Sequence, residues 1–383
     1  MKRLRAVIIF LFITWALGEI LSRIFIPLDP QKRSWDRTFQ HPFIRTEWVP
    51  GFQTTYVIEG IAGQKGTMKL EINPFGFRSS SMKTAKKPPK TSRIFFLGGS
   101  TTEEIYLPEE KTFPFLVEKK LAQKFPDRKF ECVNGGISGY LAADTLALLI
   151  YKVMYYEPDL VVVMSGVNDL RYGTFASYDP IERANYQKIL YKPNAGESPW
   201  NLLARFFKQS HFLTLIKWRI LNRFFPPEAE KYKTKLEEYD SWRKLRREEP
   251  VSVVSESKAL PDFIKYLSEM IFVARGHGVP IVLMTEASIY QKNISPEIEN
   301  QLWMGYLPEG GVNLSTEFLF REMNGFNDAV RKLARDYDVG FIDLEKEIPK
   351  TLTYFYDDVH LTPEGAQRAS EVISTYLRER SLS

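Results

Sequence analysis

A serine in the first third of the chain and an aspartate and a histidine near its end are residue types that can act together in nucleophilic chemistry. Ser100 directly follows the apolar run "RIFFLGG", while Asp357 and His360 lie three residues apart in "YFYDDVHLTPEG". A serine attacks a carbonyl only when a base takes its proton and an acid orients that base. A spacing of three lets the carboxylate fold back onto one imidazole nitrogen, which leaves the other nitrogen for the serine. We therefore take Ser100, His360 and Asp357 as a candidate catalytic triad.

Each of these residues also has an ordinary structural interpretation. Ser100 could be a turn or N-cap residue, because serine commonly begins helices. A phosphate-binding loop is a weaker alternative, since the lysine of GxxxxGK[ST] is missing. Asp357 and His360 alone could be a surface pair, and Asp358 is a second carboxylate beside them. The spacing favours Asp357, because a carboxylate two residues from the histidine has a harder path back to its ring.

Two further positions could supply the oxyanion hole that acyl transfer requires. Gly139 in "NGGISGY" follows a second strand pattern, and its backbone N–H can approach a ligand without a side chain in the way. Asn168 in "SGVNDL" follows a third strand pattern and offers a side-chain amide. Together with the N–H of Ser100, three donors could converge on one oxygen, and losing one such donor costs roughly 3–4 kcal/mol of barrier in other hydrolases. Alone, each segment is ordinary turn chemistry.

The elements around these residues predict a parallel α/β sheet. Apolar strand patterns lie at residues 93–99, 129–136, 159–166, 279–287 and 339–346. Helical periodicity separates them, and Thr362 as N-cap with Pro363 as the first helical residue predicts a last helix directly after the histidine. Strands alternating with helices indicate a sheet with helices on both faces. In such sheets, ligands lie beyond the carboxyl ends of the strands, which is where the candidate residues fall.

Composition excludes several other classes of protein. The 383 residues carry 52 Lys and Arg against 47 Asp and Glu, and this mild surplus, with no basic cluster interleaved with aromatic residues, does not argue for nucleic acid. The single Cys132 excludes an internal disulfide and a Cys-rich zinc site. The four histidines are scattered, so a histidine metal site is not expected; they are His41, His211, His277 and His360. No cofactor is expected.

The N-terminus predicts a membrane segment. "MKRLR" is basic, and the apolar run of residues 6–18 follows it. A spanning helix needs about 20 apolar residues and a signal h-region about 7–15. No small-x-small cleavage site follows, so we favour an uncleaved signal-anchor over residues 1–27, with a cleaved signal and a buried helix as alternatives. The basic flank stays cytoplasmic under the positive-inside rule, which places the body outside, in the periplasm or extracellular space.

The remaining chain divides into two parts. Residues 28–92 predict a small β-rich region that ends in the basic, proline-containing linker "KTAKKPPKTS", and residues 93–383 predict the main domain. An insertion at about 171–257 interrupts the α/β alternation. Its basic, aromatic first half could be a helical pair on the core or a membrane-facing or substrate-capping surface, and its charged second half predicts a solvated helix. A smaller insertion, residues 288–315, could be a loop over the sheet edge.

The order of the four blocks resembles that of the SGNH hydrolases, also called the GDSL esterase/lipase family. The blocks are "GGST", "NGGISG", "GVND" and "DDVH", and the resemblance covers about residues 93–377. It implies a flavodoxin-like three-layer α/β/α sandwich. The family's nucleophile maps onto Ser100, and its catalytic aspartate and histidine map onto Asp357 and His360.

The family's oxyanion glycine and asparagine map onto Gly139 and Asn168. One departure is that the family's GDS motif has Gly99 where the aspartate stands. Because that aspartate is not one of the catalytic block residues, its loss indicates a divergent subgroup rather than an inactive protein. The segment "NPFGFRSS", residues 73–80, is similar to a stretch that precedes the first block in envelope-anchored relatives, and we expect Arg78 to have a structural role there.

These observations predict a membrane-anchored, extracytoplasmic serine esterase that acts on an acyl ester. Acetate on an envelope glycan is the favoured substrate, an expectation that comes from the anchor and from the resemblance. The alternatives are an O-acyltransferase with the same triad, a lysophospholipase or lipase, and a non-catalytic binding or assembly protein. The lipid alternative predicts that polar substitution of Phe206 or Trp218 abolishes activity. The oligomeric state stays open.

Overall fold

The centre of the molecule is a five-stranded sheet in which every strand is parallel to its neighbours. The strands are β5 (Thr91–Gly98), β6 (Lys129–Gly136), β7 (Leu160–Met164), β8 (Ile281–Met284) and β11 (Gly340–Ile342). Their order across the sheet is β11-β8-β7-β5-β6, which is the flavodoxin-like arrangement. The predicted parallel α/β sandwich is therefore confirmed.

This computed structural model describes residues 2–25, 38–39, 41, 43–61, 64–179, 212, 236–308 and 311–380. Most of the larger insertion lies outside the described residues, and so do Phe206 and Trp218. The expectation that the first half of this insertion forms a helical pair, or a membrane-facing or substrate-capping surface, concerns residues outside the described ranges.

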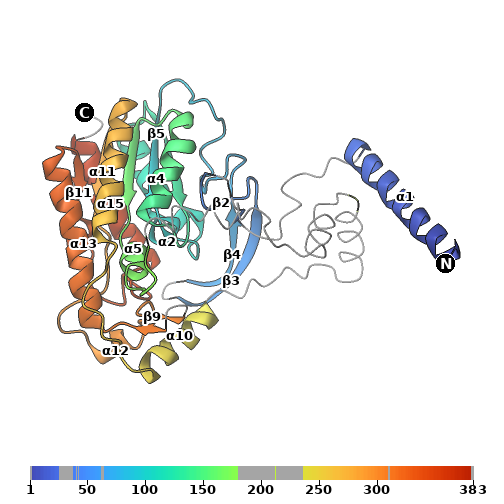
Figure 1. The fold of residues 1–383 in the computed structure, drawn as a ribbon. Helices are drawn as coiled ribbons and strands as arrows, with labels where there is room; N and C mark the ends of the chain where they lie inside the picture. Colours follow the sequence, from blue (N-terminus) through green and yellow to red (C-terminus); the bar gives the residue numbers. More distant parts are fainter. Residues whose placement is uncertain are drawn as a thin grey trace.

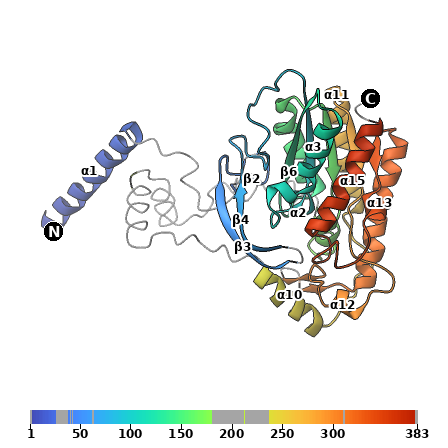
Figure 2. The same ribbon diagram turned by 180° about the vertical axis from the view of Figure 1, so that it is seen from behind.

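Helices cover both faces of the sheet. On one face lie α3 (Phe113–Lys124) and α15 (Pro363–Arg380), which pack against each other (Figure 2). On the other face lie α4 (Ala142–Tyr151), α11 (Leu260–Gly276) and α13 (Thr316–Asp336), with α11 between its two neighbours (Figure 1). The predicted start of α15 is confirmed, because the Thr362 hydroxyl accepts a hydrogen bond from the N–H of Gly365 at 3.1 Å.

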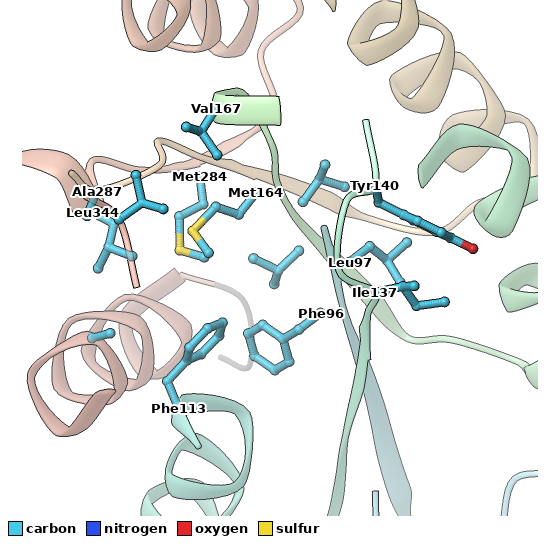
Figure 3. Packing of buried hydrophobic residues seen from close by; sticks show 14 of the residues in the cluster. Phe96, Leu97, Phe113, Ile137, Tyr140, Met164, Val167, Met284, Ala287 and Leu344 are labelled. Atoms are coloured by element: carbon cyan, nitrogen blue, oxygen red, sulfur yellow. The ribbon is translucent and has the colours of Figure 1, made fainter. Parts of the chain in front are cut away.

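The core lies between the sheet and these helices. The strands β7 and β8 consist of apolar residues throughout, as expected of strands covered on both faces, and Val161, Val162 and Val163 are at most 1% exposed. Figure 3 shows Phe96 of β5 against Phe113 of α3, whose rings meet edge to face with centroids 5.6 Å apart. Such contacts hold β5 in place, and the candidate serine lies just beyond its end.

The N-terminal region begins with the long helix α1 (Lys2–Phe25), which Figure 1 shows apart from the sheet. Residues 5–22 within it are long and apolar enough to cross a membrane, with a mean hydropathy of 1.8, as expected either of an anchor or of a signal sequence. Two antiparallel pairs follow, formed by β1 (Thr38–Phe39) with β2 (Glu47–Trp48) and by β3 (Gln53–Ile61) with β4 (Gln64–Glu71). The β3–β4 hairpin buries its alternate residues in the same core as the sheet.

Short elements complete the described chain. They are α2 (Ser100–Glu103), η2 (Glu109–Lys111), η3 (Val153–Tyr156), α5 (Val167–Tyr172), α10 (Leu236–Glu248), α12 (Pro296–Glu299), β9 (Tyr306–Leu307), β10 (Val312–Asn313) and α14 (Leu344–Glu347). Three of them follow parallel strands directly at the carboxyl edge of the sheet: α2 follows β5, α5 follows β7, and α14 follows β11. The candidate residues lie at this edge.

Candidate active site

Ser100, His360 and Asp357 form one chain of hydrogen bonds at the carboxyl edge of the sheet. Ser100 is the first residue of α2, and its Oγ lies 2.8 Å from Nε2 of His360. The other ring nitrogen, Nδ1, lies 2.7 Å from Oδ2 and 2.9 Å from Oδ1 of Asp357. Residues that are 260 positions apart thus meet within the reach of one proton transfer.

The two adjacent carboxylates have different partners. Asp357 turns back onto its own loop, where Oδ1 accepts from the backbone N–H groups of Val359 (3.1 Å) and His360 (2.9 Å). Asp358 points away from the histidine, and its Oδ1 accepts from the hydroxyl of Tyr290 at 2.8 Å. The geometry therefore agrees with the choice of Asp357 for contact with the imidazole.

Burial and charge act in opposite directions on this pair. Burial lowers the pKa of the His360 imidazole, but the Asp357 carboxylate more than compensates, so the pKa lies above its usual value. Burial likewise raises the pKa of Asp357, and the facing imidazole outweighs it, so this pKa lies below its usual value. The pair therefore favours an ionised aspartate, which is the state that can stabilise an imidazolium.

The two further candidate donors lie close to the serine in space. Gly139 and Asn168 both line the cavity that contains Ser100 and His360. Gly139 has a φ of +79°, a left-handed conformation that glycine adopts without strain. The Asn168 amide donates from Nδ2 to the carbonyl of Tyr140 at 3.0 Å. A Cβ on Gly99 would lie 2.9 Å from that Nδ2, so the glycine that replaces the family's aspartate lets this amide come close to the start of α2.

Two buried glutamates connect α2 to the segments that carry these donors. Glu103 accepts from the N–H of Ser138 at 3.1 Å and from its hydroxyl, and Ser138 directly precedes the candidate glycine. Glu286, which follows β8, accepts from the hydroxyl of Thr101 and from the N–H of Val167, both at 2.7 Å. Glu103 thus joins α2 to the residue before Gly139, and Glu286 joins the residue after Ser100 to the residue before Asn168. Burial raises the pKa of Glu286.

The contacts of Arg78 show the structural role of the segment "NPFGFRSS". Its guanidinium donates from Nη1 to the carbonyls of Glu103 (2.7 Å) and Glu104 (2.6 Å), and from Nη2 to that of Leu107. These carbonyls lie at the end of α2 and just beyond it, where a helix leaves acceptors without intrahelical partners. The backbone of Arg78 also bridges to Asn134 on the edge strand β6. Its contacts are therefore structural, and they support the short helix that begins with Ser100.

A cavity of about 530 Å³ opens beside Ser100 and His360. Its wall includes the side chains of seven aromatic residues, which are Tyr106, Tyr172, Phe175, Tyr239, Trp242, Trp303 and Tyr356. Arg45 and Arg171 also line it. The cavity can therefore hold a ligand larger than a small acyl group, with apolar contact and cationic groups near the serine.

Helix α10, from the second half of the insertion, differs from the solvated helix that its charge predicts. Tyr239 is only 8% exposed, and the rings of Tyr239 and Trp242 form part of the cavity wall. Arg246 donates from Nη2 to the hydroxyl of Thr316 at 2.7 Å. The aromatic residues of this helix, Tyr239 and Trp242, thus cover the cavity.

Sequence reasoning missed several residues that hold this site together. Glu103 lies shortly after the first strand pattern and Glu286 lies near the end of the fourth, but no motif marks them as partners of distant loops. Trp303 belongs to the smaller insertion, which we expected to be a loop over the sheet edge. Arg45 comes from the N-terminal region, and its Nη1 reaches Asp144 at 3.0 Å and the Gly139 carbonyl at 3.3 Å. Within the described ranges, no group of three or more His, Cys, Asp or Glu residues could hold a metal ion.

The five-stranded parallel sheet covered by helices on both faces is the fold of the SGNH class of ester hydrolases. Residues 96–368 match the model of the GDSL-like lipase/acylhydrolase family, and the chain belongs to that family. It is therefore a carboxylic ester hydrolase. No curated protein sequence matches the chain.

Solved structures similar to this chain include two acetyl xylan esterases and a lipase. The acetylxylan esterase Axe2 from Geobacillus stearothermophilus is 16% identical with a TM-score of 0.41, covering 76% of this chain and 95% of its own. The acetyl xylan esterase AlAXEase is 15% identical with a TM-score of 0.40, covering 74% and 98%. A GDSL-like lipase from Bacteroides thetaiotaomicron is 12% identical with a TM-score of 0.38, covering 75% and 88%.

Proposed function

We propose that the chain hydrolyses its ester through a covalent acyl-enzyme on Ser100. Ser100 attacks the ester carbonyl while His360 takes the hydroxyl proton, and Asp357 orients the imidazole and stabilises its charged form. The tetrahedral intermediate then collapses, and His360 gives the proton to the departing alcohol. Water attacks the acyl-enzyme by the same steps in reverse and releases the acid. The observation that carries this proposal is the 2.8 Å contact between Ser100 Oγ and His360 Nε2.

We further propose that the N–H groups of Ser100 and Gly139 and the amide of Asn168 hold the negative oxygen of the intermediate. The support is that Gly139 and Asn168 line the cavity beside the serine and that Gly99 leaves room for the amide. Preorganised donors of this kind stabilise charge that develops only in the transition state.

The proposed substrate is an acyl ester, with acetate as the favoured acyl group, on an extracytoplasmic carbohydrate or another envelope molecule. The aromatic and arginine side chains of the cavity wall suit a polar ring compound. Residues 1–27 are proposed to anchor the chain, residues 28–92 to form a small β-rich region with its linker, and residues 93–383 to form the hydrolase domain. The length and hydropathy of α1 support the anchor.

The proposal is tested with the full-length protein in detergent. We expect wild type to hydrolyse p-nitrophenyl acetate and to release acetate from acetylated polysaccharide, and we expect Ser100→Ala and His360→Ala to do neither. Transfer of the acyl group to an added sugar hydroxyl, in place of release to water, would identify an acyltransferase with the same triad. Full activity of Ser100→Ala would contradict the proposed mechanism.

A further inference from the structure

Trp303 connects the cavity wall to the acidic member of the proposed triad. It lies in the segment between β8 and α13 and is 5% exposed. Its indole Nε1–H donates to Oδ2 of Asp357 at 2.9 Å, and this is the oxygen that lies 2.7 Å from His360 Nδ1. Its backbone N–H donates to Oδ2 of Asp358 at 2.8 Å. Both adjacent carboxylates therefore hold Trp303, one through the backbone and one through the ring.

The orientation of the indole ring is fixed by residues from two other segments. Tyr239 of α10 stacks on it, with ring centroids 4.2 Å apart and planes 8° apart. The guanidinium carbon of Arg171 lies over the ring, 5.3 Å from its centroid, and Arg171 Nε donates to the carbonyl of Met304 at 2.8 Å. Trp242 of α10 packs against the same ring at 5.0 Å. The indole therefore has little freedom to turn its N–H away from the carboxylate.

A donor on Asp357 does two things for a neighbouring histidine. It disperses negative charge on the carboxylate, and it fixes the plane in which the carboxylate meets the imidazole. Asp357 is wholly buried, so water cannot replace this donor at low cost.

We infer that Trp303 is a positioning residue of the esterase, which holds Asp357 against His360, and that helix α10 of the insertion makes the triad competent by clamping the indole. This inference rests on the proposed function. It assigns the insertion a part in the reaction itself, in addition to its place in the cavity wall. It also differs from a purely structural role, in which Trp303 would fill space and contribute to stability alone.

The first experiment separates these roles with Trp303→Phe, which keeps an aromatic ring but removes the N–H. We expect kcat for p-nitrophenyl acetate to fall about tenfold with little change in KM, as expected for the loss of one hydrogen bond to a buried charge. We also expect the acid limb of the pH–kcat/KM profile to move to higher pH. A carboxylate with one donor fewer attracts the imidazolium more strongly, and the other groups acting on His360, namely Asp358 and Glu286, are retained.

The second experiment is a double-mutant cycle. In an Asp357→Asn background, Trp303→Phe should cause less than about a twofold further loss, because the group on which it acts is already changed. Trp48→Phe is the matched control, since Trp48 is also buried but packs against Phe52 in the N-terminal region. We expect it to lower the melting temperature, as core substitutions do, and to leave the acid limb of the pH profile unchanged.

Two results would overturn the inference. One is a Trp303→Phe protein that hydrolyses the ester at the wild-type rate with an unmoved acid limb. The other is an equal loss from Trp303→Phe in both backgrounds, which is the signature of a structural role. If Trp303→Phe shows no cooperative melting transition, Tyr239→Leu takes its place: it should lower kcat and move the acid limb in the same direction, and an unmoved limb contradicts the clamp. Ser100→Ala, measured alongside, shows separately whether the proposed nucleophile holds.

Discussion

The nucleophile and the base of this site are held in place by two different kinds of structure. Ser100 begins a helix directly after the interior strand β5, and the carbonyls at the end of that helix are bound by Arg78. His360 lies in a loop whose geometry depends on Asp357 and on the indole of Trp303. The nucleophile thus depends on the strand that precedes it and on one buried guanidinium. The base depends on the side chain of Asp357 in its own loop and on Trp303 from the smaller insertion.

The largest expected loss of activity comes from removing the carboxylate that contacts the base, His360. Asp357→Asn should lower kcat/KM roughly 10⁴-fold, as loss of the orienting carboxylate does in other serine hydrolases. The acid limb of the remaining activity should move to lower pH: the neutral imidazole is the active form, and the carboxylate is what raises its pKa. A pH–rate profile measures both effects. The matched control is Asp358→Asn, and a loss as large as that of Asp357→Asn would contradict the separate roles of the two carboxylates.

The next effect tests the donors near the nucleophile. Asn168→Ala should lower kcat about 10²–10³-fold and leave KM nearly unchanged, because the amide is proposed to bind an oxygen that becomes charged only in the transition state. Steady-state kinetics on p-nitrophenyl acetate separates the two constants. A rise in KM with an unchanged kcat would mean that the amide binds substrate in its ground state.

The contribution of Arg78 to the structure around the nucleophile is tested by measuring the free energy of unfolding. Arg78→Met leaves the carbonyls of Glu103 and Glu104 without their buried donor, and we expect a loss of about 2–4 kcal/mol in the free energy of unfolding. Denaturant unfolding measures the loss. Arg128→Met at an exposed position is the control for removing a positive charge. If both variants unfold at the same denaturant concentration as wild type, the guanidinium does not support α2.

The smallest effect distinguishes two adjacent glycines. A Cβ on Gly98 would lie 2.1 Å from the backbone oxygen of Met164, so Gly98→Ala should lower the melting temperature. A Cβ on Gly99 would lie 2.9 Å from Asn168 Nδ2, so Gly99→Ala should displace the amide and lower kcat by about fivefold, a cost near 1 kcal/mol. Thermal melting and kinetics on both variants check this. An unchanged kcat in Gly99→Ala would show that the amide has room to move.

The sheet and the order of the site residues follow from patterns that a sequence displays directly. A buried parallel strand is a short apolar run, and Ser100, Gly139 and Asn168 each come just after one. Because the carboxyl ends of parallel strands share one edge, sequence order alone predicts that these residues converge. His360 is predicted to lie at the same edge because it follows the last strand pattern. Thr362 and Pro363 predict that a helix begins directly after it.

The residues that were missed act across large sequence separations through single side chains. Trp303 lies 54 positions before the aspartate that it contacts, in a segment with no periodic pattern. Glu286 lies 185 positions after Thr101. Helix α10 is mostly charged, and a few aromatic positions on one side of it were not enough to predict that it covers the cavity. Contacts of this kind depend on the assembled fold, so local patterns do not show them.

The central claim is that Ser100 is a nucleophile activated by His360, and covalent labelling with a fluorophosphonate probe tests it most directly. We predict that the wild-type protein is labelled on Ser100, as mass spectrometry of the digested protein would show, and that Ser100→Ala and His360→Ala are not labelled. Labelling of Ser100→Ala at the wild-type rate, or of another residue in the wild-type protein, would contradict the account.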